Sequence, residues 1–301
     1  MDEAIVKTRP YHTNTAPTDA EGYEPAIADP PAHLYDHDEV FQGGVTGLAA
    51  LSSAELTLFH EQGFLMLRQA LSAAEVKDAL AGVEALCAGQ VSGDYVVRYE
   101  ADARGRFDPL EPERRQDAIR KLSDFVAFEP RLQAVSRHAG LLEILREMLG
   151  DEPRMFQDMA LLKPPRIGRE KPWHQDCAYF DLPEGTQVVG IWLALDEAVV
   201  ENGCMHVIPG SHRAGPVVHF QRRDWQICDS DVQTGRCLAL PMQPGDCLFF
   251  DGLLHHGTPP SHSPLRRRAL QFHYRPASVD FLPDDLERLR LFGEGGKDVS
   301  C

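Results

Sequence analysis

The residues best suited to chemistry are a histidine and an aspartate two positions apart, His174 and Asp176, and a later histidine, His256. Two neutral imidazoles and one carboxylate on one face of an octahedral ion make the ligand set of non-haem Fe(II) oxygenases, with three positions left open. In an extended strand, residues i and i+2 point to the same side, so one strand can present His174 and Asp176 while Gln175 faces away. The third ligand must then come from another strand.

The context of the distal histidine supports a metal site more strongly than the triplet alone. A glycine turn at Gly245 precedes an apolar run of strand character that ends at two adjacent histidines before Gly257. Because side chains alternate along a strand, only one of His255 and His256 can face a metal. We choose His256 for its Gly-Thr neighbours and its spacing to Arg267, and expect His255 on the outer face or in solvent.

Arg267 belongs to a strand-like segment, 266–274, whose apolar side chains alternate with polar ones. An arginine that faces inward needs an anion, and its planar fork matches a carboxylate in bidentate fashion. This geometry suits the distal carboxylate of a 2-oxo diacid whose other end chelates the metal. We interpret the flanking Arg266 and Arg268 as solubilising residues.

Composition limits the partners and the compartment. The chain has 301 residues, is 43% hydrophobic and carries a formal net charge of −16, which argues against nucleic acids and anionic membranes as partners. We expect a loosely ordered arm over 1–50 and a single catalytic domain over 51–301. Seven scattered cysteines without a Cys-x-x-Cys pair predict reduced thiols, and no stretch is apolar enough to span a bilayer, so a cytoplasmic protein is expected.

Helical patterns precede strand patterns along the chain. Two capping boxes, Ser52 with Glu55 and Ser72 with Glu75, start helices, and the first of these ends at Gly63. Further helices are expected over 112–122, which includes Lys121, and over 141–149, and strands are expected over 64–71, 155–163, 172–179, 188–195, 204–209, 236–242, 246–255 and 267–275. This order predicts a β-rich α+β fold, an antiparallel sandwich or barrel buttressed by helices.

Several motifs, taken together, carry a family resemblance. They are Lys-Leu-Ser-Asp-Phe at 121–125, Met159 with Lys-Pro-Pro at 163–165, the triplet 174–176, Ile-Trp-Leu-Ala-Leu-Asp at 191–196, Glu-Asn-Gly-Cys-Met-His-Val-Ile-Pro-Gly-Ser-His at 201–212, His-Gly-Thr at 256–258 and Arg-Arg-Ala at 267–269. From about residue 59 to 274 the chain resembles the phytanoyl-CoA dioxygenase family of Fe(II)- and 2-oxoglutarate-dependent oxygenases. The resemblance implies a double-stranded β-helix, a jelly-roll or cupin-like core, with the metal between two sheets.

The resemblance also assigns roles. It implies that His174, Asp176 and His256 hold the iron and that Arg267 anchors the distal carboxylate of 2-oxoglutarate. The positions that match the co-substrate pocket are Lys121, Met159, Trp192 and Thr258, with Gln175 in less direct contact. One departure is Ser261, where the family often has asparagine.

The implied reaction is hydroxylation of an aliphatic C–H of a small molecule, with an acyl-CoA or a secondary metabolite as candidates. It would consume O2 and 2-oxoglutarate and release succinate and CO2. The intact Asp176 carboxylate favours hydroxylation over halogenation, because related halogenases have a small residue there. Desaturation, cyclisation and epimerisation stay open, as do a non-catalytic cupin-like metal- or ligand-binding protein and a hydrolytic zinc site. The residues that select the substrate are expected in 1–50, 90–110 and 214–235. No sequence feature indicates the oligomeric state.

Overall fold

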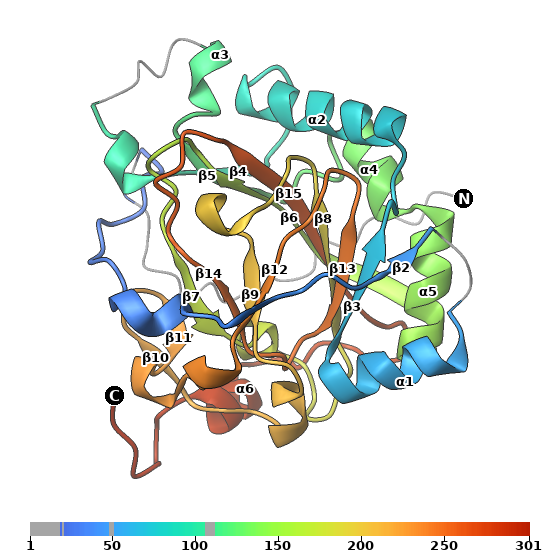
Figure 1. Cartoon of the computed structure of the whole chain (residues 1–301), viewed down its shortest axis with the longest axis vertical. Coiled ribbons are helices and arrows are strands. Elements are labelled where there is room, and N and C mark those ends of the chain that lie inside the picture. Colours follow the sequence, from blue (N-terminus) through green and yellow to red (C-terminus); the bar gives the residue numbers. More distant parts are fainter. Residues whose placement is uncertain (1–18, 20, 48–50, 106–111) are drawn as a thin grey trace.

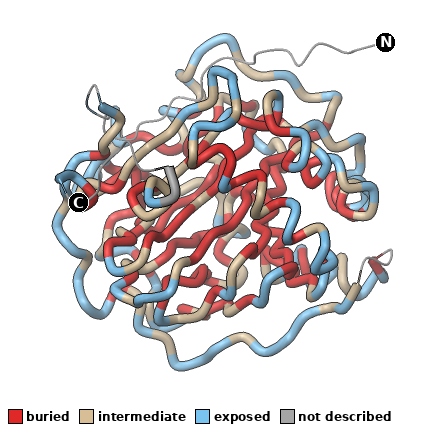
Figure 2. The backbone as a smooth tube through the Cα atoms, turned by 90° about the horizontal axis from the view of Figure 1, so that it is seen from above, coloured by how far each residue is buried: buried red, intermediate tan, exposed pale blue. Residues whose placement is uncertain are grey.

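The computed structural model describes residues 19, 21–47, 51–105 and 112–301. Two β-sheets face each other at its centre, and helices cover the outer face of the larger sheet (Figure 1). Figure 2 shows buried chain concentrated in the central strands, with exposed chain in the loops around them. The predicted β-rich α+β fold with a double-stranded β-helix core is confirmed.

The helices begin and end largely where the capping signals predict. They are α1 (Ser53–Gln62), α2 (Ala73–Cys87), α3 (Pro112–Arg115), α4 (Pro130–Ser136), α5 (Ala139–Leu149) and α6 (Leu286–Phe292). Both predicted capping boxes form, because Ser52 and Ser72 each exchange two hydrogen bonds with the glutamate three residues later. Gly63 and Gly150 adopt the left-handed conformation that ends α1 and α5.

The larger sheet has eight strands and the smaller sheet five. The order in the larger sheet is β2 (Val45–Thr46), β3 (Phe64–Arg68), β13 (Cys247–Asp251), β8 (Val189–Ala194), β15 (Arg267–Pro276), β6 (Pro153–Lys163), β5 (Ile119–Ser123) and β4 (Val96–Tyr99). The order in the smaller sheet is β1 (Glu39–Val40), β12 (Leu238–Leu240), β9 (Met205–Val207), β14 (His256–Thr258) and β7 (Lys171–His174). A separate hairpin pairs β10 (His219–Gln221) with β11 (Trp225–Ile227).

Alternation along the strands separates two cores. In β8, Ile191 and Leu193 join the core under the helices, whereas Trp192 and Ala194 join the core between the sheets. In β15 the predicted alternation holds, so that Arg267 lies on the face directed at the smaller sheet while Leu270 packs under the helices. The inner faces of β6, β8 and β15 therefore carry the residues that can form a site.

The described part of the predicted arm is built into the fold. Over 21–47, β1 pairs with β12 and β2 pairs with β3, so the segment adds an edge strand to each sheet. The buried Leu34 also accepts a hydrogen bond at its backbone oxygen from the Trp173 indole. Its few apolar residues and backbone groups thus find partners in distant strands. Residues 1–18 and 20 lie outside the described residues.

Three element predictions need correction. The charged segment predicted as a helix over 112–122 is helical only in α3, and Ile119–Ser123 forms β5 between β4 and β6. Sheet pairing and the burial of Ile119 and Leu122 override local helix propensity there. The strand expected over 172–179 stops at His174, and a 3₁₀ turn follows. The strand expected over 246–255 is β13 followed by a turn, and His256 opens a separate strand.

Two predictions about individual residues are also wrong. Arg268 is not a solubilising residue, because it is buried and its Nε and Nη2 atoms each lie 2.8 Å from the Asp196 carboxylate. The cysteines are not all reduced, because Cys228 and Cys301 form a disulfide, which joins residues far apart in sequence. None of the helices in the described part of the chain is long and apolar enough to cross a membrane.

Candidate active site

The predicted metal ligands converge between the two sheets. His174 ends β7, Asp176 opens the turn two residues later, and His256 opens β14, where it is the antiparallel register partner of His174. All three side chains are buried, and their ligand atoms lie within 4.8 Å of one another. Asp176 Oδ1 is 3.1 Å from His174 Nε2 and 3.6 Å from His256 Nε2. Gln175 keeps an extended backbone, which explains why the i and i+2 side chains share a side although the strand ends at His174.

Backbone carbonyls fix the orientation of both imidazoles. The Nδ1 atom of His174 lies 2.7 Å from the Pro172 oxygen, and that of His256 lies 2.9 Å from the Leu254 oxygen. When Nδ1 donates its proton to these acceptors, each Nε2 is left with a lone pair, the form in which histidine binds metals. Burial, followed by the neighbouring His174, lowers the pKa of His256 to about 3. Two lone pairs and a carboxylate thus meet in a dry space, an arrangement that fits a divalent cation.

The second oxygen of Asp176 is held by β15. His273 Nε2 lies 2.6 Å from Asp176 Oδ2, and Gln271 donates to the same oxygen at 3.2 Å. Burial would raise the pKa of Asp176, but His273 and His256 hold it well below its usual range, so the group is a carboxylate. The sequence places Gln271 and His273 on the inner face but assigns them no role, because nothing local links them to Asp176.

Arg267 is buried and has no carboxylate partner among the described residues. It is 2% exposed, its Nη1 donates to the Leu161 oxygen at 3.1 Å, and its guanidinium carbon lies 5.2 Å from the centre of the Trp192 ring. In the described part of the chain, no acid lies within ion-pair distance of it, and its Nε has no hydrogen-bond partner. Burial lowers the pKa of Arg267 to about 10. A buried arginine in this state fits the carboxylate of a bound ligand.

One cavity joins the metal ligands to this arginine. Its empty volume is about 980 Å³ and includes the open mouth. Its walls include the metal ligands His174, Asp176 and His256, and also Arg267, Lys121, Met159, Trp192 and Thr258. Lys121 reaches the cavity from β5 rather than from the predicted helix. Burial, followed by the charges of Lys171 and Arg98, lowers the pKa of Lys121 to about 8.

Gln175, for which we expected a less direct contact with the co-substrate, is not among the residues that line the cavity. Gln175 is fully buried, its amide nitrogen donates to the Gly215 and Leu253 oxygens, and its amide oxygen accepts from the backbone of Val217. Because strand alternation turns Gln175 away from its neighbours, its side chain ties the 215–217 loop to the metal-binding turn instead.

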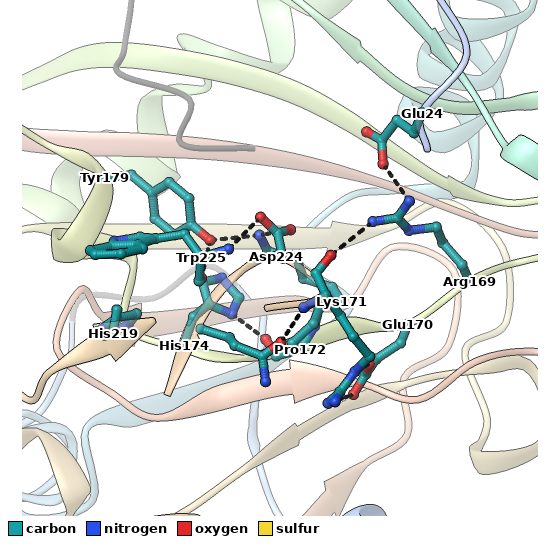
Figure 3. A network of polar contacts seen from close by, with 12 residues as sticks. Glu24, Arg169, Glu170, Lys171, Pro172, His174, Tyr179, His219, Asp224 and Trp225 are labelled. Carbon is teal, nitrogen blue, oxygen red and sulfur yellow. Dashed lines mark hydrogen bonds and ion pairs between the residues drawn. The ribbon is translucent and has the colours of Figure 1, made fainter. Parts of the chain in front are cut away.

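A network of charged side chains lines the cavity, and we refer to the wall formed by Lys171, Tyr179, Asp224, Glu24, Arg120 and Arg169 as its mouth. Figure 3 shows the hydrogen bonds and ion pairs of this network. Lys171 donates to Asp224 at 2.7 Å and to the Tyr179 hydroxyl at 2.8 Å, and this hydroxyl donates to the Trp225 oxygen. Burial opposes ionisation of Asp224, but Lys171, the Trp225 backbone and Arg120 together outweigh it and lower the pKa of Asp224 to about 2. Tyr179 also packs edge-on against the His174 ring, so the network begins beside the metal ligands.

A second part of the mouth comes from the N-terminal segment. The buried Glu24 lies 3.1 Å from Arg120 and 3.1 Å from Arg169, so one carboxylate bridges two arginines. All three residues line the cavity. Sequence reasoning placed substrate choice partly in 1–50 but did not identify this network, whose members come from segments with no common motif.

The two-sheet fold and the buried histidine–aspartate–histidine cluster define the class of non-haem Fe(II)- and 2-oxoglutarate-dependent oxygenases. A sequence profile of the phytanoyl-CoA dioxygenase family matches residues 59–269. The chain belongs to this family, and it is a 2-oxoglutarate-dependent non-haem iron dioxygenase.

Individual proteins agree with this assignment. The peroxisomal phytanoyl-CoA dioxygenase of Bos taurus is 28% identical over 249 residues, which cover 77% of this chain and 71% of that protein. EvdO2 from Micromonospora carbonacea var. aurantiaca, solved with 2-oxoglutarate, is 26% identical with a TM-score of 0.62, over 81% of this chain and 98% of that one. The carbocyclase SnoK from nogalamycin biosynthesis, 22% identical with a TM-score of 0.63 over 86% of this chain and 97% of that one, shares the fold.

Proposed function

We propose that this dioxygenase hydroxylates an aliphatic C–H bond of a small molecule. The observation that carries the proposal is a single cavity that contains three converging metal-ligand side chains and a buried arginine with no carboxylate partner among the described residues. A metal site without turnover needs no such arginine, whereas a 2-oxo diacid needs both a metal to chelate and a cation for its far end.

The proposed roles follow from the positions of the side chains. His174 and His256 would bind Fe(II) through Nε2, Asp176 would bind it through a carboxylate oxygen, and His273 and Gln271 would keep that carboxylate in place. Arg267 would pair with the distal carboxylate of 2-oxoglutarate, and Lys121, Met159, Trp192 and Thr258 would surround the same molecule.

When bound, Fe(II) and 2-oxoglutarate supply the oxidising chemistry with O2, and the chain supplies geometry and a dry pocket. Asp176 fills the carboxylate position that a halide would otherwise require, which supports hydroxylation. Trp192 and Met159 are buried in the wall of the cavity, Trp192 beside the arginine, where they would exclude water from the charged groups.

The charged mouth favours a polar small molecule as the primary substrate. Lys171 retains donor capacity beyond its bonds to Asp224 and Tyr179, and these residues line the same cavity. A substrate with a hydroxyl or amine group could accept a hydrogen bond from the remaining N–H of Lys171. An unmodified hydrocarbon chain would offer this N–H no acceptor. This supports a secondary metabolite over a plain acyl chain.

We propose a cytoplasmic location. The five cysteines that form no disulfide among the described residues support it, and the disulfide between Cys228 and Cys301 counts against it. Imaging of a tagged chain tests it, and a signal confined to another compartment would contradict it.

The reaction is tested by incubating the Fe(II)-loaded protein with 2-oxoglutarate, O2 and a panel of polar metabolites. We expect succinate release to rise with one panel member, whose mass increases by one oxygen atom. A product that has lost two hydrogens would indicate desaturation, and a product with an inverted stereocentre and no added oxygen would indicate epimerisation. Either result would contradict the proposed hydroxylation.

A further inference from the structure

A second buried cation lies directly beside Arg267. Lys163 ends β6, and it is the antiparallel register partner of Arg267 at the start of β15. Register partners project to the same face of a sheet, where their Cβ atoms lie about 5 Å apart. Lys163 is 3% exposed and lines the same cavity as Arg267 and the metal ligands.

The stem of Lys163 is held in a narrow slot between two glycines. A Cβ on Gly203 would lie 2.7 Å from both Cδ and Cε of Lys163, and one on Gly168 would lie 2.8 Å from its Cβ. The Lys163 ammonium donates to the Arg169 backbone oxygen at 2.5 Å. One of its three protons is thereby used, and the position of the nitrogen is fixed at the cavity wall.

Lys163 and Arg267 have no anionic side chain of their own among the residues that the structure describes. In the described ranges, no carboxylate lies within ion-pair distance of Lys163 or Arg267. The two nearest buried acids are otherwise engaged: Glu170 binds Arg223 at 2.7 Å and the Tyr35 hydroxyl at 2.7 Å, and Glu100 accepts from the Arg169 backbone at 3.1 Å. Burial, followed by the charge of Arg267, lowers the pKa of Lys163 well below its usual value. A bound anion would favour the charged form of Lys163, whereas in an empty site the repulsion favours its neutral form.

We propose that Lys163 is a second cationic contact for the distal carboxylate of 2-oxoglutarate and that, with Arg267, it selects a dicarboxylic over a monocarboxylic 2-oxo acid. This inference rests on the proposed function and deepens it. Arg267 offers a planar fork, and Lys163 adds a point charge from the neighbouring strand, so one carboxylate can accept from both. Lys163 is a positioning residue for the co-substrate and takes no part in the reaction at the metal.

A purely structural role is the rival explanation, because the bond to the Arg169 oxygen also ties down the 164–170 loop. The two explanations differ in how they depend on the ligand. A contact with the distal carboxylate disappears when the ligand has no such group. A structural defect weakens every 2-oxo acid that chelates the same metal.

The test is an anaerobic titration of Fe(II)-loaded protein with 2-oxoglutarate and with 2-oxopentanoate, which has the same chelating end and no distal carboxylate. Binding is read from the visible metal-to-ligand charge-transfer band. We expect Lys163→Met, which keeps an unbranched side chain in the slot, to raise the Kd of 2-oxoglutarate about 10-fold and to change the Kd of 2-oxopentanoate less than about 2-fold. Arg267→Met should show the same pattern with a larger effect.

Arg166→Met is the matched control, since it removes an exposed cation of the same loop. It should change neither Kd, and thermal unfolding should show all variants folded. Equal weakening of both acids by Lys163→Met, or no effect on either, would overturn the inference while leaving the dioxygenase intact. If iron-loaded wild type gives no band with either acid, the proposed site and this inference both fail.

Discussion

The two ends of the cavity are built in different ways. At the metal end, every functional side chain lies on or directly after a strand of the two-sheet core, and the register of β7 with β14 and of β15 with β6 places them. At the mouth, Arg120 and Lys171 also lie on core strands, β5 and β7, but their acidic partners Glu24 and Asp224 come from segments outside the two sheets. Strand register therefore fixes the metal end, whereas the mouth also depends on ion pairs with segments outside the sheets.

In the proposed function, the metal end carries out the reaction and the mouth selects the substrate. A metal and its co-substrate need positions accurate to a fraction of an ångström, which strands supply through their backbone hydrogen bonds. The segments that carry Glu24 and Asp224 lie outside both sheets, so they can change in sequence without disturbing the register of β7, β14 and β15. Variants at the two ends should accordingly fail in different measurements.

The largest effect is expected for Asp176→Ala. It removes the only carboxylate of the ligand cluster found in the described residues, so Fe(II) affinity should fall by more than about 100-fold and 2-oxoglutarate should produce no charge-transfer band. Anaerobic iron binding followed by absorbance checks this. Retention of wild-type iron affinity would exclude Asp176 as a ligand.

Arg267→Ala should leave iron binding in place and raise the Kd of 2-oxoglutarate about 100-fold, because it removes the buried fork at the far end of the cavity. The same titration measures it. An unchanged Kd would mean that the co-substrate carboxylate binds elsewhere.

His273→Phe should weaken Fe(II) binding about 10- to 100-fold by releasing one oxygen of Asp176. Tyr274→Phe is the matched control, because Tyr274 lies on the opposite face of β15 and its hydroxyl donates to the Ser136 oxygen. That variant should lower the free energy of unfolding by about 1 kcal/mol and leave iron affinity unchanged. Similar iron affinities in the two variants would refute the supporting role of His273.

A smaller effect is expected from pH. The pKa of Lys121 is lowered to about 8, so this side chain is charged below pH 8 and neutral above it. The charged form attracts a dianion, and the affinity for 2-oxoglutarate should therefore fall several-fold from pH 7 to 9. Lys121→Met should bind more weakly at pH 7 and show a flatter profile. An equally steep profile in this variant would assign the titration to another group.

The mouth should have the least influence on the co-substrate. Asp224→Asn removes the carboxylate partner of Lys171 and should lower the free energy of unfolding by about 2 kcal/mol, yet keep the Kd of 2-oxoglutarate within about 2-fold of wild type. Chemical denaturation and the anaerobic titration measure the two quantities. A large loss of 2-oxoglutarate affinity would remove the distinction between the two ends.

Sequence reasoning succeeded where function depends on local spacing. The i and i+2 rule paired His174 with Asp176, and alternation separated His256 from His255, which is buried but does not belong to the ligand cluster. It failed where long-range pairing decides the outcome. Lys121 reached the cavity from a strand that local charge made look helical, and His273 gained a role only through its contact with Asp176.

The same reason explains the remaining errors. Arg268 was expected to be exposed to solvent beside two other arginines, but it forms an ion pair with Asp196. The disulfide between Cys228 and Cys301 and the strands of the N-terminal segment also join parts of the chain that no sequence motif connects. The ion-pair network at the mouth falls in the same category, and this is why the substrate is harder to predict than the reaction.

The most direct test is to load the wild-type protein with Fe(II) without oxygen and to add 2-oxoglutarate. We expect one iron per chain and a weak visible charge-transfer band that saturates with one equivalent of 2-oxoglutarate and is lost in Asp176→Ala. A folded, iron-loaded protein that gives no band would contradict the central claim that His174, Asp176 and His256 hold iron in the same cavity in which Arg267 receives the co-substrate.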